Sequence, residues 1–220
     1  MKEPAFLAIA HLWVGCIRIV AGYIALAAPK GKTLHRAAGT CFFVTMILLC
    51  ASGLWLSLAR DILFTVYLSW LAFHAVVTGW ATAASRHSFA RVITYLSPLS
   101  SLTMMAGAVI GAFRAASAPD GMLNGLPPGA FLAIAGIACL ISGLDGLFIF
   151  RSFHHGARRT ARHGWRMGFS MFLASGIFFF GNTRFLPEAL HHPVFLATPV
   201  LLVVCLTAWF AIRARFQTRA

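Results

Sequence analysis

Acidic residues are scarce in this chain: only five of its 220 residues are Asp or Glu, and charged residues make up 10% of the total. A soluble domain is usually about one quarter charged, so this composition argues against a water-soluble fold. The shortage of acids also gives little support to catalysis by a pair of carboxylates. An apolar content of 60% excludes a disordered chain, which would be poor in apolar residues.

The chain also lacks the short motifs of common catalytic and nucleotide-binding sites. It has no nucleophile elbow, P-loop, GxGxxG fingerprint, HExxH motif or EF-hand loop. Its five cysteines are an odd number without a CxxC pair, which argues against a disulfide framework. Whether the protein is an enzyme stays open, and the missing motifs favour a non-enzymatic role.

Seven long apolar stretches occupy most of the sequence. Each has about 19 to 24 residues, enough for a helix to cross a hydrocarbon core of about 30 Å, and the mean hydropathy is +0.82. None alternates as the strands of a membrane barrel do. We predict an all-α bundle of seven transmembrane helices, forming a single domain over residues 1–220. The stretches lie near residues 5–28, 37–58, 62–84, 92–113, 128–150, 164–182 and 194–212.

Basic residues are confined to alternate connections between these stretches. Thirteen Lys and Arg residues and no acid fall near 29–36, 85–91 and 151–166 and in the C-terminal tail, whereas the opposite side has zero net charge. Because short basic loops stay in the cytoplasm, we expect the N-terminus outside and the C-terminus inside. This topology explains the net charge of +13 without nucleic acid. The basic face should instead attract anionic lipids.

Two opposite charges lie at membrane depth, where ionisable residues are costly and face the bundle interior. Arg18 is near the middle of the first stretch, and Asp145 lies two-thirds of the way along the fifth. A rise of about 1.5 Å per residue gives them similar depths. We therefore predict an ion pair between Arg18 and Asp145. Arg166 and His163 are the alternative partners of Asp145.

Two histidines share this membrane region. His11 lies on the same helical face as Arg18, and His74 is near the middle of the third stretch. Each histidine has two possible roles: a structural one, as a hydrogen-bond partner of a neighbouring helix, and a functional one. We predict an intramembrane polar site composed of His11, Arg18, His74 and Asp145.

Two further histidines stand at the basic ends of helices, each with an arginine nearby. His35 and Arg36 open the second stretch, and His163 and Arg166 open the sixth. Two imidazoles at matching depth are able to ligate a b-type haem, with the arginines near its propionates. The alternative is that these residues contact lipid phosphates or helix ends.

A third cluster lies in the predicted outer loop. Glu188, His191 and His192 would approach one another on a helical turn, and such a set is able to hold a divalent metal. Sets of this size are common by chance, so an ordinary polar loop is the competing interpretation and no metal is expected.

Glycine and proline predict two packing features. Gly107 and Gly111 form a GxxxG pair suited to close helix contact inside the bundle. Pro98 frees a backbone carbonyl in the fourth stretch, and Ser97 is among the neighbouring hydroxyls able to satisfy it. A second row of small residues, which also suits close helix contact, lies in the fifth stretch: Gly129, Gly136 and Gly143.

The segments HRAAG and RHGWRMGFSMFLASG resemble a family of multi-pass bacterial membrane proteins known only as a domain of unknown function. The likeness covers the first three and last three stretches and leaves 92–127 unmatched. It implies a helical membrane fold in the bacterial inner membrane and no activity. The matching positions are His11, Lys30, Gly31, His35, Arg36, Gly39, Asp145, His163, Arg166, Met167, the run Phe178 to Phe180, and Pro187.

The order of these elements also suggests an internal duplication. Each His-led helix, the second and the sixth, follows a helix with a buried charge and a basic loop, as a 3+1+3 parallel repeat would produce. Three functions remain open: a small binding or transport module with a polar intramembrane site, a haem-binding redox protein, and an accessory subunit of a membrane complex.

Overall fold

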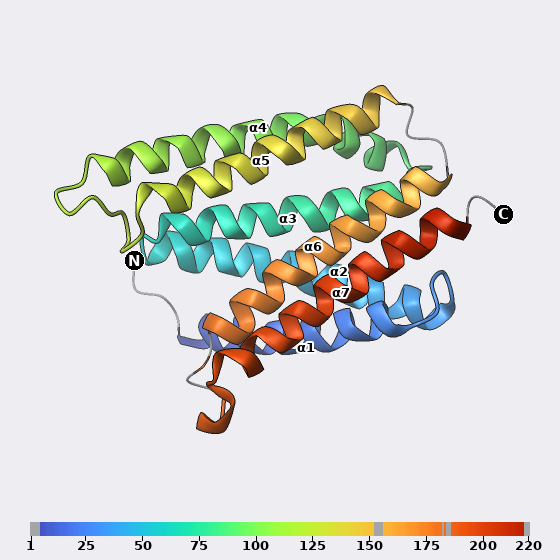
Figure 1. Ribbon diagram of the computed structural model, residues 1–220, viewed down its shortest axis with the longest axis horizontal. Helices are drawn as coiled ribbons and strands as arrows, with labels where there is room; N and C mark the ends of the chain where they lie inside the picture. Colours follow the sequence, from blue (N-terminus) through green and yellow to red (C-terminus); the bar gives the residue numbers. More distant parts are fainter. Residues whose placement is uncertain (1–4, 152–155, 182, 184–185, 218–220) are drawn as a thin grey trace.

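The computed structural model describes residues 5–151, 156–181, 183 and 186–217, and the described part of the chain is helical throughout apart from turns and one isolated bridge. The predicted all-helical fold is therefore confirmed. Seven α-helices run back and forth along one long axis (Figure 1). They are α1 (Ala5–Ala27), α2 (Thr33–Ala59), α3 (Leu63–Ala83), α4 (Ser88–Ala116), α5 (Pro128–Phe150), α6 (Gly156–Gly181) and α7 (Pro193–Gln217).

Six of these helices, all but α6, are long and apolar enough to cross a membrane. The first turns of α6 carry Arg158, Arg159, Arg162 and Arg166, which lower its hydropathy. Helix α6 also begins eight residues before the predicted apolar stretch, because hydropathy marks only the apolar part of a helix that continues into a basic segment. The chain is thus a multi-pass membrane protein by the length and composition of its helices.

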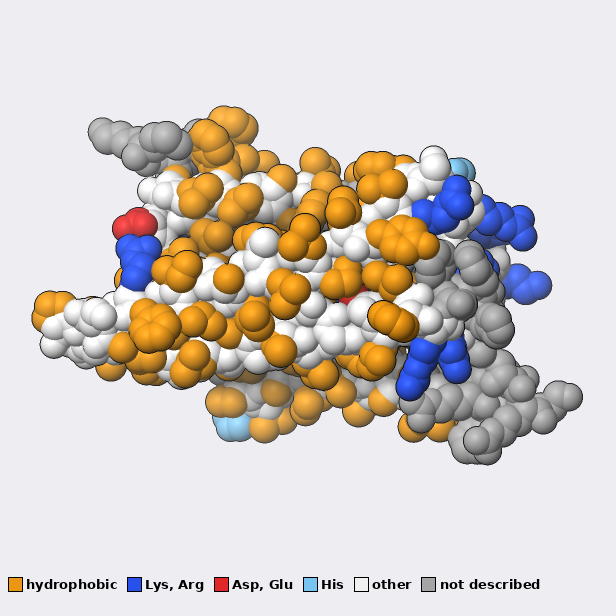
Figure 2. Space-filling view, turned by 90° about the horizontal axis from the view of Figure 1, so that it is seen from above, with side chains coloured by type: hydrophobic (Ala, Val, Ile, Leu, Met, Phe, Trp, Pro, Cys, Tyr) orange, Lys and Arg blue, Asp and Glu red, His pale blue; other side chains and the backbone are white. Residues whose placement is uncertain are grey.

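The outer surface of the bundle is apolar along most of its length. Large side chains such as Trp13, Ile110 and Leu140 are 60–65% exposed, and Figure 2 shows apolar side chains covering the middle of the molecule. A soluble monomer rarely exposes an apolar surface of this extent. Polar residues occupy the interior instead, where Arg18, His74 and Asp145 are each at most 3% exposed.

Lysine and arginine gather at one end of the bundle (Figure 2). The α1–α2 and α3–α4 connections lie at this end, together with the end of α5, the start of α6 and the end of α7 (Figure 1). We call it the basic end.

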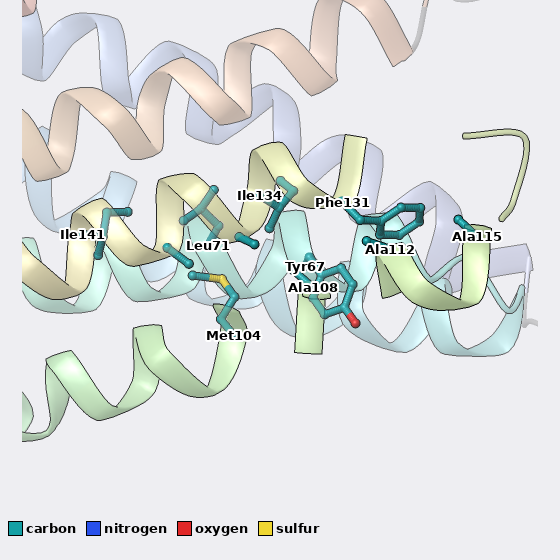
Figure 3. Close-up of a cluster of buried hydrophobic side chains, with 11 residues drawn as sticks. Tyr67, Leu71, Met104, Ala108, Ala112, Ala115, Phe131, Ile134 and Ile141 are labelled. Carbon is teal, nitrogen blue, oxygen red and sulfur yellow. The ribbon is translucent and has the colours of Figure 1, made fainter. Parts of the chain in front are cut away.

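Helix α3 lies at the centre of the bundle. The α4–α5 hairpin packs on one of its sides, and α2 and α6 pack on its other sides. The hairpin packs on α3 through an apolar cluster that includes Leu71, Met104 and Phe131 (Figure 3). The GxxxG pair serves this contact as predicted, because a Cβ at Gly111 would lie 2.8 Å from the ring of Phe131 and one at Gly107 3.2 Å from Tyr67.

The second glycine row has no such role. A Cβ built on Gly129, Gly136 or Gly143 meets no atom within 4 Å, so this row faces open space and the expected helix contact is wrong.

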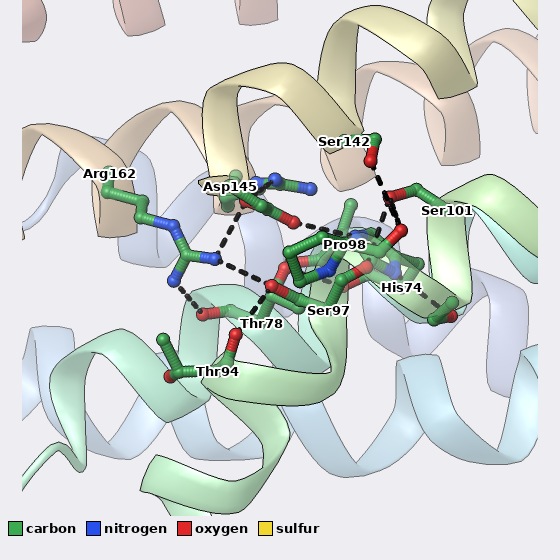
Figure 4. Close-up of polar contacts among 12 residues, drawn as sticks. His74, Thr78, Thr94, Ser97, Pro98, Ser101, Ser142, Asp145 and Arg162 are labelled. Atoms are coloured by element: carbon green, nitrogen blue, oxygen red, sulfur yellow. Dashed lines mark hydrogen bonds and ion pairs between the residues drawn. The ribbon is translucent and has the colours of Figure 1, made fainter. Parts of the chain in front are cut away.

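Pro98 interrupts the hydrogen bonds of α4 beside the bundle's polar interior. Proline has no N–H to donate to the carbonyl four residues earlier, and here the Ser97 hydroxyl donates to that carbonyl, on Thr94, at 2.8 Å. The predicted role of Ser97 is therefore confirmed. The carbonyl of Pro98 in turn accepts a hydrogen bond from Ser142 of α5 at 3.1 Å, which ties the two helices together (Figure 4).

Candidate functional site

Asp145 of α5 is the centre of a buried ionic network that joins three helices (Figure 4). Its Oδ1 accepts hydrogen bonds from Arg162 Nη2 at 2.8 Å and from Arg166 Nη2, both on α6. Its Oδ2 accepts from His74 Nε2 of α3 at 3.2 Å. All four side chains are at most 4% exposed. We call these residues the Asp145 network.

The geometry of α6 explains why two arginines reach one carboxylate. Arg162 and Arg166 are four residues apart, so they lie on the same helical face. That face approaches α3 closely at Gly79, where an added Cβ would lie 3.2 Å from Cβ of Arg166. The His163 ring donates from Nδ1 to the Gly79 carbonyl at 2.9 Å and fixes the same contact.

A chain of hydrogen bonds holds the imidazole ring of His74 in place. Trp70 Nε1 donates to the Ser100 hydroxyl at 3.3 Å, and that hydroxyl lies 3.3 Å from His74 Nδ1. The carboxylate of Asp145 accepts from Nε2, and the hydroxyl of Ser100, which is able both to donate and to accept, pairs with Nδ1. Helix α4 therefore supplies the fourth side of the site.

Arg162 also has partners outside the carboxylate. Its Nη1 donates to the Thr82 hydroxyl at 2.5 Å, and its guanidinium lies over the Phe148 ring, 4.4 Å from the centroid. Arg166 has a similar cation–π contact with Trp165 at 4.3 Å. These contacts hold both arginines in fixed positions without balancing their charge.

The Asp145 network holds more positive than negative charge, because two guanidinium groups share a single carboxylate. No second carboxylate pairs with either arginine among the described residues. Three buried N–H groups, on Arg162 Nε and on Arg166 Nε and Nη1, have no hydrogen-bond partner within the described part of the chain. Unpaired buried donors of a charged group are costly.

The predicted ion pair between Arg18 and Asp145 is wrong. Arg18 is 1% exposed, donates to the Ala174 carbonyl at 3.0 Å and lies 3.9 Å from Met46 Sδ. Helix α1 packs on α2, α6 and α7, whereas α5 packs on α4 and α3, so the two charges belong to different contacts. The alternative partner, Arg166, is the one found.

The four residues of the predicted polar site are therefore divided. His74 and Asp145 bond directly to each other. His11 bonds instead through Nδ1 to the Ser52 hydroxyl of α2 at 2.8 Å, and Arg18 is held between α1, α2 and α6. From the sequence alone, Arg162 is only one of the basic residues near 151–166, and its place in the Asp145 network was not predicted. Its spacing of four from Arg166 is the signal that would have placed both side chains on one helical face.

His35 and His163 have similar local geometries. The Nδ1 of His35 lies 2.9 Å from the Ala25 carbonyl, and that of His163 lies 2.9 Å from the Gly79 carbonyl. A carbonyl only accepts, so both Nδ1 atoms carry a proton and Nε2 is the nitrogen of each ring that is able to ligate a metal. Arg166, however, lies in the Asp145 network, away from the position expected for a contact to haem propionates.

The outer-loop residues make separate contacts. His191 Nε2 donates to the Leu186 carbonyl at 3.0 Å, and His192 Nδ1 accepts from the Val194 amide at 3.3 Å. Glu188 begins a short 3-10 helix, Glu188–Leu190. Within the described ranges, no group of three or more His, Cys, Asp or Glu side chains is arranged to hold a metal ion.

A cleft of about 280 Å³ lies between α5 and α6 near the basic end. Its walls include Leu144, Leu147 and Trp165, and Arg151 and Arg158 lie at the same end. Arg162 belongs both to the wall of this cleft and to the Asp145 network. The cleft therefore adjoins the Asp145 network at Arg162.

No family model matches this chain, and neither a curated protein nor a solved structure shows significant similarity to it. The resemblance to the family of unknown function thus stays a prediction.

Proposed function

We propose that this protein is an anion-binding module of the bacterial inner membrane, with its ligand site at Arg162 and Arg166. One observation carries the proposal: two fully buried arginines share one carboxylate and leave three N–H groups unpaired. A ligand with a negative charge would balance the network and accept those hydrogen bonds.

The energetic argument rests on burial. A charged group in a low-dielectric interior is stable only when it is paired and hydrogen-bonded, and here one of two guanidinium charges is not balanced. The Asp145 carboxylate has a positioning role, because it holds both arginines beside the cleft. The cleft offers the route by which an anion would approach Arg162.

The proposed membrane orientation follows from the charge of the two ends. We place the basic end in the cytoplasm under the positive-inside rule, with α6 as the seventh span and the N-terminus outside. The cleft would then open near the inner leaflet, where anionic lipids are attracted to the basic connections. The 3+1+3 repeat stays a prediction, to be tested by superposing α1–α3 on α5–α7.

Thermal stability of the purified protein in a neutral detergent tests the proposal. We expect inorganic phosphate or phosphatidic acid, but not chloride at equal ionic strength, to stabilise the protein by about 2.7 kcal/mol at a concentration of 100 times Kd. Arg162→Gln and Arg166→Gln should each abolish the response. Arg91→Gln, an exposed change at the same end, is the matched control and should respond like wild type.

Both test variants should remain folded, because removing one arginine leaves a balanced pair with Asp145. Elution as a single species in gel filtration checks this point. The proposal is wrong if neither anion stabilises the wild-type protein, or if the two variants respond as strongly as Arg91→Gln.

A second candidate function is haem binding through His35 and His163. The observation that favours it is the Nδ1–H bond of each ring to a backbone carbonyl, which orients Nε2 as a metal ligand. A Soret band in the purified protein that is lost in His35→Ala and His163→Ala would establish this function; a spectrum without one after haem addition would reject it.

A further inference from the structure

The walls of the cleft between α5 and α6 combine two kinds of surface. Leu144 and Leu147 are 41% and 50% exposed on the apolar flank of α5, which faces the membrane. Arg151 follows at the end of the same helix, and Arg158 donates from Nη1 to the Arg151 carbonyl at 3.4 Å. One side of the cleft is therefore apolar, and the end nearest the loop is basic.

The length of the cleft matches this division. Leu144 to Arg151 covers seven residues, or about 10 Å of helix at 1.5 Å per residue. That distance accommodates a charged headgroup and the first part of an acyl chain. Trp165 on the α6 wall is amphipathic and suits the boundary between headgroup and hydrocarbon.

Arg162 adds a buried positive charge to the wall of this mostly apolar cleft. It is 4% exposed, it belongs to the cleft wall, and its Nε has no hydrogen-bond partner within the described part of the chain. Arg151 and Arg158 are exposed at the basic end of the same cleft, whose lining is otherwise mostly apolar, and none of the cleft residues is acidic. The charge complementarity is therefore to a strongly anionic group, and guanidinium binds phosphate well.

Helices α5 and α6 make few backbone contacts with each other, so the cleft is bounded mainly by side chains. A ligand that enters sideways from the bilayer crosses Leu144 and Leu147 and reaches Arg162 without passing through water. A free anion would have to cross the same apolar flank or arrive between Arg151 and Arg158. The apolar wall thus favours a ligand with its own hydrocarbon chain.

We propose that the anion bound at this site is the phosphate headgroup of a membrane lipid that enters the cleft laterally from the leaflet at the basic end. This inference rests on the proposed anion-binding function and names its ligand class. The acyl chain lies along Leu144 and Leu147, and the phosphate lies against Arg162, between Arg151 and Arg158. Arg166 adds its charge from behind Arg162 through the shared Asp145 carboxylate.

The test compares three probes in a neutral detergent: dioleoylphosphatidic acid, dioleoylphosphatidylcholine and inorganic phosphate. Native mass spectrometry counts bound lipid, and thermal stability gives the apparent affinity. We expect the phosphatidic acid to bind at least about tenfold more tightly than inorganic phosphate, with one lipid retained per protein. Phosphatidylcholine should bind about tenfold more weakly than phosphatidic acid, because its headgroup has no net charge.

Leu147→Trp separates the lipid from the free anion, because the larger side chain fills the apolar wall and leaves the arginines unchanged. It should lower the affinity for phosphatidic acid about tenfold and leave that for inorganic phosphate unaltered. Leu140→Trp is the matched control, since Leu140 is 64% exposed on the same helix and is not part of the cleft. It should behave like wild type.

Each contrary result has a distinct meaning. Equal affinity for phosphate and phosphatidic acid, with no effect of Leu147→Trp, overturns the lipid inference and leaves the anion-binding function standing. Equal binding of phosphatidylcholine and phosphatidic acid also overturns it, because the headgroup charge is then not recognised. If neither anionic probe binds, both the inference and the proposed function fail.

Discussion

Asp145→Asn is the substitution that tests the Asp145 network most directly. It preserves the size of the side chain and removes the only negative charge that pairs with Arg162 and Arg166 in the described part of the chain. The asparagine oxygen still accepts from the arginines, and His74 is able to change tautomer to accept from the new amide. Hydrogen bonds are therefore largely conserved, and the loss is one of charge.

The expected magnitude follows from burial. Removing one member of a buried ion pair costs about 3–5 kcal/mol, because the remaining charge has no compensation. Here two buried guanidinium groups lose their shared partner, so we expect a decrease in unfolding free energy toward the upper part of that range. Asp120→Asn changes an exposed acid and should alter stability by less than about 0.5 kcal/mol.

Denaturant titration in detergent micelles, followed by circular dichroism, measures both variants. The double variant Asp145→Asn with Arg166→Met should be more stable than Asp145→Asn alone, because it removes one of the two unbalanced charges. If Asp145→Asn is within 1 kcal/mol of wild type, the carboxylate does not compensate the arginines and the reasoning fails.

Two further predictions concern packing and topology. Gly79→Leu should destabilise the protein by about 1–3 kcal/mol, because its side chain meets Arg166 across the α3–α6 contact, whereas Gly136→Leu faces open space and should not; equal unfolding midpoints would contradict this contact. A reporter active only outside the cytoplasm should be inactive when fused after Ala220 and active when inserted after Asp120; the reverse pattern would invert the proposed orientation.

The helical class and the charge division were predictable from the sequence because each depends on local composition. Apolar length predicts the helices, and the positions of Lys and Arg predict which connections share an end. The same local signals explain Ser97, whose role follows from its place beside Pro98.

The partners of Asp145 were less predictable because helix adjacency is a tertiary property. Depth along a helix suggested Arg18, but α1 and α5 do not adjoin in the bundle. Arg162 was missed because hydropathy places a basic residue outside the span, although α6 continues through it and buries it at 4% exposure. The spacing of Arg162 and Arg166 indicates a shared face, and only the packed structure identifies what that face meets.

The position of Asp145 in the chain has a consequence for how the bundle is assembled. Chains are synthesised from the N-terminus, so α5 is made before the arginines that follow it by 17 and 21 residues. His74, on the earlier helix α3, is the one member of the network that already exists when Asp145 emerges. The imidazole is therefore the one member of the network with which this carboxylate is able to pair before α6 has been made.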